Sequence, residues 1–158
     1  MGTTFDLEGF RERLKIAFPP QPFHRVVSTH DECDQGIELR RELPGKRWDE
    51  LRGDLLDNSS LSICLLQPAA MTAFLPAWLL RSMEIVARDN LTLEFTLYFL
   101  CPGDEEEGWQ TERAVELVES FDSAQRAVVA EFLRAILERP NLRQLHRHAA
   151  QGLKWWSV

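Results

Sequence analysis

The sequence lacks the short motifs that mark the common nucleotide-binding, hydrolase and zinc sites. None of its eight glycines stands two positions from another, which excludes the glycine-rich fingerprint of dinucleotide-binding folds. Gly45 is followed by Lys46 but has no glycine five positions earlier, so it does not form a P-loop. Gly-x-Ser-x-Gly, Cys-x-x-Cys and His-Glu-x-x-His patterns are also missing. We therefore expect no catalytic residue, no metal, no cofactor and no enzymatic activity.

Cysteines are few, and long apolar runs are missing. Cys33, Cys64 and Cys101 are odd in number and far apart, which is typical of reduced, mostly buried thiols. Residues 1–18 are rich in charge and contain no apolar stretch of the kind found in a secretion signal. The most apolar window, residues 63–86, is interrupted by polar side chains, whereas a membrane span needs about 20 apolar residues. These features predict a cytoplasmic protein that does not enter a membrane.

Negative charge is concentrated in one part of the chain. At 158 residues the sequence is long enough for one domain with a real core, and we expect residues 1–158 to form it. The net charge is −7, and residues 104–122 carry the whole imbalance, since the other residues hold 17 acids and 17 bases. Nucleic-acid binding needs a basic footprint, which this charge balance does not provide.

Residues 63–86 form the apolar centre of the sequence. Pro68 is well placed as the first residue of a helix, where its missing N–H costs nothing. The apolar residues that follow recur at helical spacing on a face too broad for a surface helix. Pro76 interrupts this run, which predicts either a helical hairpin or one helix kinked there. We expect a buried core segment, with a ligand groove at the kink as the alternative.

Helical spacing of apolar residues and helix-capping patterns extend over most of the remaining chain. Thr29 and Glu32 have the spacing of a capping box, as do Asp122 and Gln125, and Asn141 is placed to cap the last helix. The predicted helices cover residues 5–18, 29–43, 47–58, 111–121, 123–138 and 141–156.

Two segments leave the secondary structure open. Residues 59–66 and 91–100 alternate between apolar and polar side chains, which is typical of β-strands. The alternation favours a strand at 91–99, although Leu91, Phe95, Tyr98 and Phe99 also fit helical spacing. The predicted fold is therefore mainly α, a compact multi-helix domain, with an optional two-stranded β element that pairs 59–66 with 91–100.

One cluster combines residues that could carry chemistry: His30, Asp31, Glu32, Cys33 and Asp34. A metal site would use His30, Cys33 and a carboxylate, and a thiol nucleophile would use Cys33 activated by His30. The neighbouring carboxylates disfavour a thiolate by like-charge repulsion. A capped helix start with Cys33 in the core is the simpler interpretation.

Histidine and tryptophan pairs occur near the C-terminus. His146 and His148 stand two positions apart, so a helix would place them on different faces and they could not share a metal. Trp155 and Trp156 either dock the last helix onto the core or form a protein-contact hot spot, since tryptophan is enriched in such spots.

A set of mostly structural residues is spread along the chain. It comprises Trp48, Pro68 to Phe74, Leu75-Pro76-Ala77-Trp78-Leu79, Phe121 to Gln125, and Phe132-Leu133. In these residues the sequence resembles an uncharacterised family of short bacterial proteins, a domain of unknown function, over most of the chain from the first helix onward. The resemblance implies a shared fold and supplies no catalytic residue.

The charge distribution favours a protein that binds another protein. Our leading hypothesis is a non-enzymatic interaction module, most concretely a bacterial immunity or antitoxin-type protein that covers the active site of a basic toxin. The alternatives are a plain solvated acidic face, or a small ligand- or metal-binding domain or enzyme with a pocket near Pro76 and the His30 and Cys33 cluster. The expected partner-binding residues are Asp104, Glu105, Glu106, Glu107, Glu112, Glu116 and Glu119.

Overall fold

The computed structural model describes residues 4–30, 32–85, 90–101 and 115–157, and these residues form helices joined by loops. The elements are α1 (Leu7–Ala17), α2 (Asp34–Glu42), η1 (Trp48–Glu50), α3 (Gly53–Asn58), η2 (Ser60–Leu65), α4 (Pro68–Glu84), α5 (Leu91–Leu100), α7 (Ser123–Leu137), η3 (Pro140–Leu145) and α8 (His146–Trp156). Residues 115–119 are also helical. The expected helix over 111–121 thus falls partly outside the described residues.

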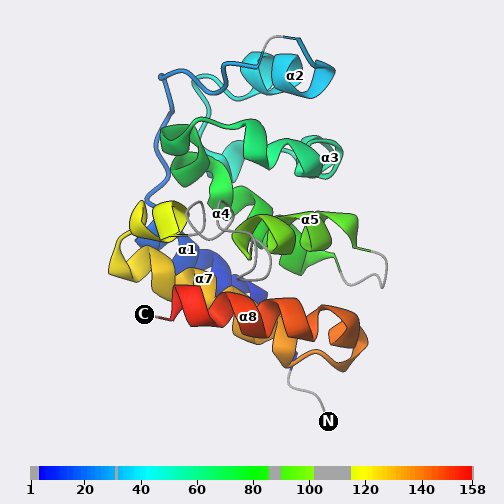
Figure 1. Ribbon diagram of the computed structural model, residues 1–158. Helices are drawn as coiled ribbons and strands as arrows, with labels where there is room; N and C mark the ends of the chain where they lie inside the picture. The colour runs from blue at the N-terminus through cyan, green and yellow to red at the C-terminus, as the bar shows by residue number, and fades with distance from the viewer. Residues whose placement is uncertain (1–3, 31, 86–89, 102–114, 158) are drawn as a thin grey trace.

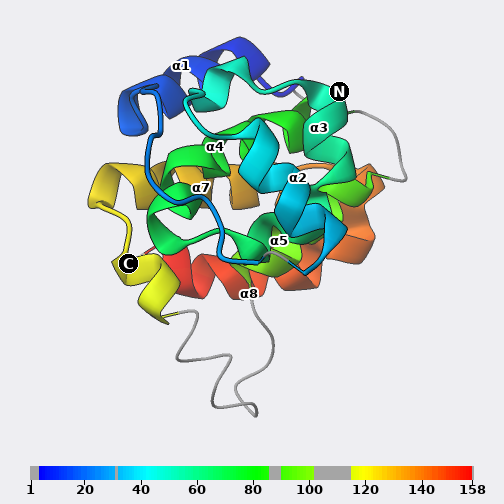
Figure 2. The same cartoon turned by 90° about the horizontal axis from the view of Figure 1, so that it is seen from above.

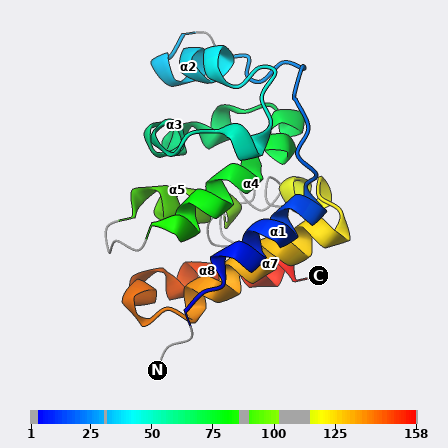
Figure 3. The ribbon, with the colours of Figure 1, turned by 180° about the vertical axis from the view of Figure 1, so that it is seen from behind.

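The helices are stacked in tiers. Figures 1 and 3 show α1, α7 and α8 at one end of the molecule, α4 and α5 in the middle, and α3 and α2 at the other end. Seen from above, α1 and α8 lie on opposite sides of α7 (Figure 2), and both pack against it. Within the described ranges, none of the helices combines the length and the apolar composition that crossing a membrane would require.

α4 is the helix around which the others pack. It contacts α1, η1, α3, η2 and α5, and ten of its 17 residues are buried. Pro68 occupies the first turn, as predicted, and the helix continues through buried Pro76, so the helical-hairpin alternative is wrong. The Trp78 indole Nε1 donates to the carbonyl of Leu56 at 3.3 Å and fixes α3 on α4. Full burial of a side chain such as Leu75 contributes about 1.5–3 kcal/mol, so this helix is the main support of the fold.

The predicted β element is wrong. Residues 60–65 form the 3₁₀-helix η2, and residues 91–100 form α5. Asn90 starts α5, because its Oδ1 accepts from Leu93 N at 3.0 Å while its amide donates to the carbonyl of Ser82 at 2.9 Å. A helix was the alternative interpretation of this segment, but a different face is buried: Leu91 and Tyr98 of the expected face are exposed. The buried residues are Thr92, Leu93, Thr96, Leu97 and Leu100, which follow helical spacing.

The N-terminal helix is as expected, but the second helix begins later than predicted. α2 starts at Asp34, with the half-buried Cys33 as its cap: the thiol Sγ accepts from Gly36 N at 3.4 Å. The capping box expected at Thr29 and Glu32 is therefore wrong. The Thr29 hydroxyl instead accepts from the Gln67 amide at 3.2 Å, which ties this segment to the start of α4.

The helix predicted over 47–58 is interrupted. η1 ends at Glu50 and α3 begins at Gly53, with Leu51 and Arg52 in extended conformation between them. The Trp48 Nε1 donates to the carbonyl of Phe18 at 2.8 Å, which anchors η1 to the end of α1. A Cβ at position 53 would lie only 2.9 Å from the Arg81 guanidinium carbon, so glycine leaves the space that this side chain needs.

The helix predicted over 123–138 is confirmed as α7, with its capping box. Asp122 Oδ1 accepts from Gln125 N at 2.8 Å, and Gln125 Oε1 accepts from Asp122 N at 3.0 Å. The last helix does not start at Asn141, because Pro140 begins the 3₁₀-helix η3 and the backbone of Leu142 leaves helical geometry. α8 then begins at His146.

Trp156 docks the last helix onto the core, which confirms one of the two alternatives for this residue. Its ring is 1% exposed and lies 5.5 Å from the ring of Phe121, centroid to centroid. The indole Nε1 donates to the carbonyl of Leu100 at 2.9 Å and so joins α8 to the end of α5. Trp155 is partly buried and packs against the same core.

Candidate functional site

Two residues of the predicted acidic surface lie in the described part of the chain. Glu116 and Glu119 are exposed on the helical residues 115–119, and neither forms an ion pair with another described residue. The other expected partner-binding residues lie outside the described residues: Asp104, Glu105, Glu106, Glu107 and Glu112. The two glutamates are three positions apart, so they are neighbours on the surface of the helix.

An apolar groove lies directly beside these glutamates. Its volume is about 280 Å³, and we call it the 64–120 groove after its first and last lining residues. It brings together the end of η2, the start of α4, the last turn of α5 and the helical residues 115–119. The lining residues are Cys64, Leu66, Pro68, Met71, Phe99, Glu116, Leu117 and Ser120.

The groove has a buried floor, half-buried walls and an exposed rim. Leu66 and Met71 are buried, whereas Phe99 and Leu117 are half-buried and present part of their apolar surface to the opening. Sequence reasoning did not find this groove, because its walls come from segments up to 56 positions apart and no local pattern connects them.

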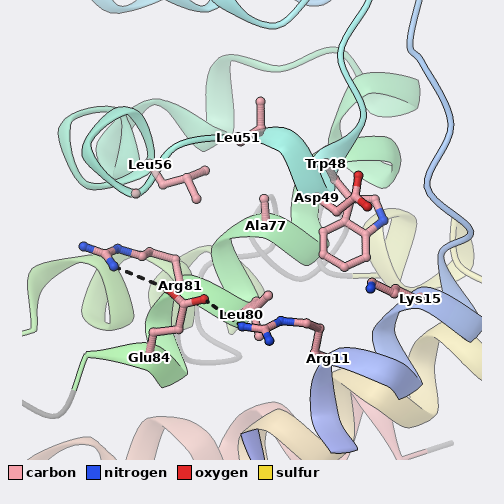
Figure 4. A pocket seen from close by; sticks show the side chains of 11 residues that line it. Arg11, Lys15, Trp48, Asp49, Leu51, Leu56, Ala77, Leu80, Arg81 and Glu84 are labelled. Atoms are coloured by element: carbon pink, nitrogen blue, oxygen red, sulfur yellow. Dashed lines mark hydrogen bonds and ion pairs between the residues drawn. The ribbon is translucent and has the colours of Figure 1, made fainter. Parts of the chain in front are cut away.

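A second pocket lies against the part of α4 that comes after Pro76 in the sequence (Figure 4). A ligand groove near Pro76 was expected as the alternative to a purely structural segment. The volume of the pocket is about 290 Å³. Ala77, Leu80 and the buried Trp48 supply apolar surface. The charged lining residues are Arg11, Lys15, Asp49, Arg81 and Glu84.

The charged residues of this second pocket are held in ion pairs, some within the pocket and some with residues beside it. Arg81 binds Asp57 with two hydrogen bonds, Nε to Oδ1 at 3.0 Å and Nη2 to Oδ2 at 2.6 Å. Its Nη1 also approaches Glu84 Oε2 at 3.4 Å, and Arg11 lies 3.7 Å from the other Glu84 oxygen. The Arg81 hydrogen bond lowers the pKa of Asp57 and, conversely, raises the pKa of Arg81. The network therefore stabilises the contact of α3 with α4 and leaves little net charge to attract a ligand.

The cluster around His30 and Cys33 is not part of this pocket. Cys33 caps α2, and His30 is exposed in the loop before it. Asp31 lies outside the described residues. Among the residues that the structure does describe, no three His, Cys, Asp or Glu side chains are grouped so that they could hold a metal ion.

The other titratable groups singled out in the sequence have separate surroundings. His146 Nε2 lies 3.0 Å from the carbonyl oxygen of Arg139, whereas the ring of His148 packs edge-on against Tyr98 at 4.7 Å between centroids. The two histidines thus have different neighbours, as their spacing predicted. Burial raises the pKa of the Cys101 thiol to about 12, which keeps it protonated and inert.

Comparison with known sequences identifies the family. The family model described as "Family of unknown function (DUF6714)" matches residues 25–158. The chain belongs to DUF6714. The expected membership of an uncharacterised family is thereby confirmed, although the match begins after α1, which the resemblance had included. No curated protein and no solved structure matches this DUF6714 chain. Both the 64–120 groove and the acidic segment fall inside the matched range.

Proposed function

We propose that this DUF6714 protein is a non-enzymatic interaction module that binds a basic protein partner through residues 104–122. Most concretely, it would act as a cytoplasmic immunity or antitoxin-type protein that neutralises a bacterial toxin by covering its active site. The observation that carries the proposal is the exposure of Glu116 and Glu119, whose charges are not matched by an ion pair with any other described residue.

Two carboxylates elsewhere in the molecule are held by arginines from other helices. Glu131 accepts hydrogen bonds from Arg13 Nε at 2.9 Å and Nη2 at 2.5 Å, and Asp57 is held by Arg81. Glu116 and Glu119 form no ion pair with another described residue, and they belong to the segment that carries the whole negative surplus of the chain. A concentrated negative field accelerates association with a positive surface by a factor of about 10 to 1,000 at low salt.

A second candidate function is a small-ligand site in the pocket beside Pro76. The observation in its favour is the apolar surface that Ala77, Leu80 and the buried Trp48 present inside this pocket. The matched charges of Arg11, Arg81 and Glu84 count against it, as does the separate position of the His30 and Cys33 cluster. Native mass spectrometry of the protein purified from its own host would reveal a retained small molecule and would then favour this candidate.

The proposed function is tested by partner capture and association kinetics. When the protein is cross-linked in its native host and purified, it should carry a basic protein with it. The triple variant Glu105→Lys/Glu106→Lys/Glu107→Lys should then associate with that partner at least tenfold more slowly at low salt. The double variant Glu32→Lys/Glu138→Lys is a control for added positive charge, because both residues are exposed and lie outside the acidic segment. An on-rate that depends on neither the acidic segment nor salt would contradict the proposal.

A further inference from the structure

The 64–120 groove has the size and lining of a site for one side chain. Sites for small molecules usually measure about 300–1,000 Å³, so a volume of about 280 Å³ is at the lower limit for a metabolite. Its surface combines the buried Leu66 and Met71 with the half-buried Phe99 and Leu117. Methionine adapts its shape to the group that it contacts, and large apolar or aromatic side chains gain most from such burial.

The charge around the groove restricts what can flank that side chain. Glu116 is the charged residue that lines the groove, and Glu119 is exposed three positions later on the same helical segment. A partner with acidic residues next to its apolar side chain would be repelled, whereas lysine or arginine there would be attracted.

We propose that the 64–120 groove receives a large apolar side chain from a basic segment of a partner protein, flanked by lysine or arginine that faces Glu116 and Glu119. This inference rests on the proposed function and adds an anchor to it. In protein interfaces a few buried apolar side chains supply most of the affinity, while surrounding charges mainly set the rate and the specificity. The groove thus sets the dissociation rate of the partner, whereas Glu116 and Glu119 contribute to its association rate.

Selection of short random peptides on the native protein tests this inference without a known partner. The enriched peptides should contain a large apolar residue with lysine or arginine beside it. Synthetic copies should bind at least tenfold more weakly when that apolar residue is replaced by alanine, which corresponds to about 1.4 kcal/mol.

Matched variants of the protein separate the groove from the charge. Cys64→Trp places a large ring at the exposed rim of the groove, and it should weaken peptide binding at least tenfold with an unchanged melting temperature. Gln35→Trp puts the same ring on exposed α2 and should have no effect on affinity. Glu116→Lys/Glu119→Lys should weaken binding in a salt-dependent way, unlike the charge control Glu32→Lys/Glu138→Lys.

The outcomes distinguish this inference from the proposed function. If Cys64→Trp leaves affinity intact while Glu116→Lys/Glu119→Lys reduces it, the groove is not the anchor and the acidic docking surface stands. If the reverse holds, the groove still takes an apolar side chain, but the basic flank facing Glu116 and Glu119 is refuted together with the acidic docking surface. Enriched peptides that are acidic, or that lack a large apolar residue, overturn both. The wild-type protein could also form an oligomer at high concentration that Cys64→Trp converts to a monomer. That result would identify a second copy of this chain as the occupant and overturn the inference.

Discussion

Gly152 lies inside α8, yet replacing it with alanine should destabilise the protein. At an exposed helical position this substitution would stabilise by about 1 kcal/mol, because glycine has more conformational freedom to lose. Here a Cβ would overlap the sulfur of Cys101 and approach Leu133 Cδ1 at 3.2 Å, and both neighbours are buried. Overpacking of this kind costs about 1–3 kcal/mol. We therefore expect a net loss of about 1 kcal/mol, with α8 displaced from α5.

Urea and thermal unfolding measure this loss directly. For a chain of this length, about 1 kcal/mol corresponds to a fall of about 2–4 °C in melting temperature. The double variant Gly152→Ala/Cys101→Ala should lose less than the sum of the two single variants, because removal of the sulfur makes room for the new methyl group. A melting temperature that rises in Gly152→Ala, or strictly additive losses in the double variant, would refute the close contact between α5 and α8.

Three further predictions concern groups inside the described part of the chain. Thr96→Val should stabilise by about 1 kcal/mol in urea unfolding, since the Thr96 hydroxyl is buried there with no hydrogen-bond partner; a loss of stability would indicate a partner. The pKa of Asp57 is lowered in the folded state, so the carboxylate should stabilise the protein fully at neutral pH. This stabilisation should fade as the pH falls below about 4, towards and through the folded pKa. The difference in unfolding free energy between wild type and Asp57→Asn should therefore become smaller over the same pH range. With a thiol reagent at neutral pH, Cys64 should react in the native protein and Cys101 only after unfolding, as mass spectrometry of labelled peptides would show.

Helices whose boundaries are set locally could be predicted from the sequence. The start of α7 depends on hydrogen bonds between Asp122 and Gln125, which are three positions apart, so the pattern alone was sufficient. The start of α4 at Pro68 is local in the same way. The Asn90 cap of α5 is local as well, but the interpretation of residues 91–99 rested on their alternation and did not use it.

Features that depend on distant contacts could not be predicted. The break between η1 and α3 lies between two distant contacts, that of Trp48 with Phe18 and that of Gly53 with Arg81, and neither contact leaves a pattern in residues 47–58. Thr29 does not cap α2, because Gln67, 38 positions away, bonds to it instead. The 64–120 groove is a feature of the same kind, since Phe99 and Leu117 become neighbours of Met71 only through tertiary packing.

The concentration of acids in residues 104–122 is what favours a role for this segment outside the chain, since it holds eight acids and one base. Crowded like charges repel one another and destabilise a compact state, so folding alone would favour acids dispersed among the arginines. Asp57 and Glu131 follow that rule, each held by an arginine from another element. Glu116 and Glu119 form no ion pair with another described residue; the exposed Glu32 and Glu138 share this property, but they stand outside the acidic segment. A basic partner would relieve the repulsion on binding, and the apolar surface of Leu117 between the two glutamates would be covered in the same step.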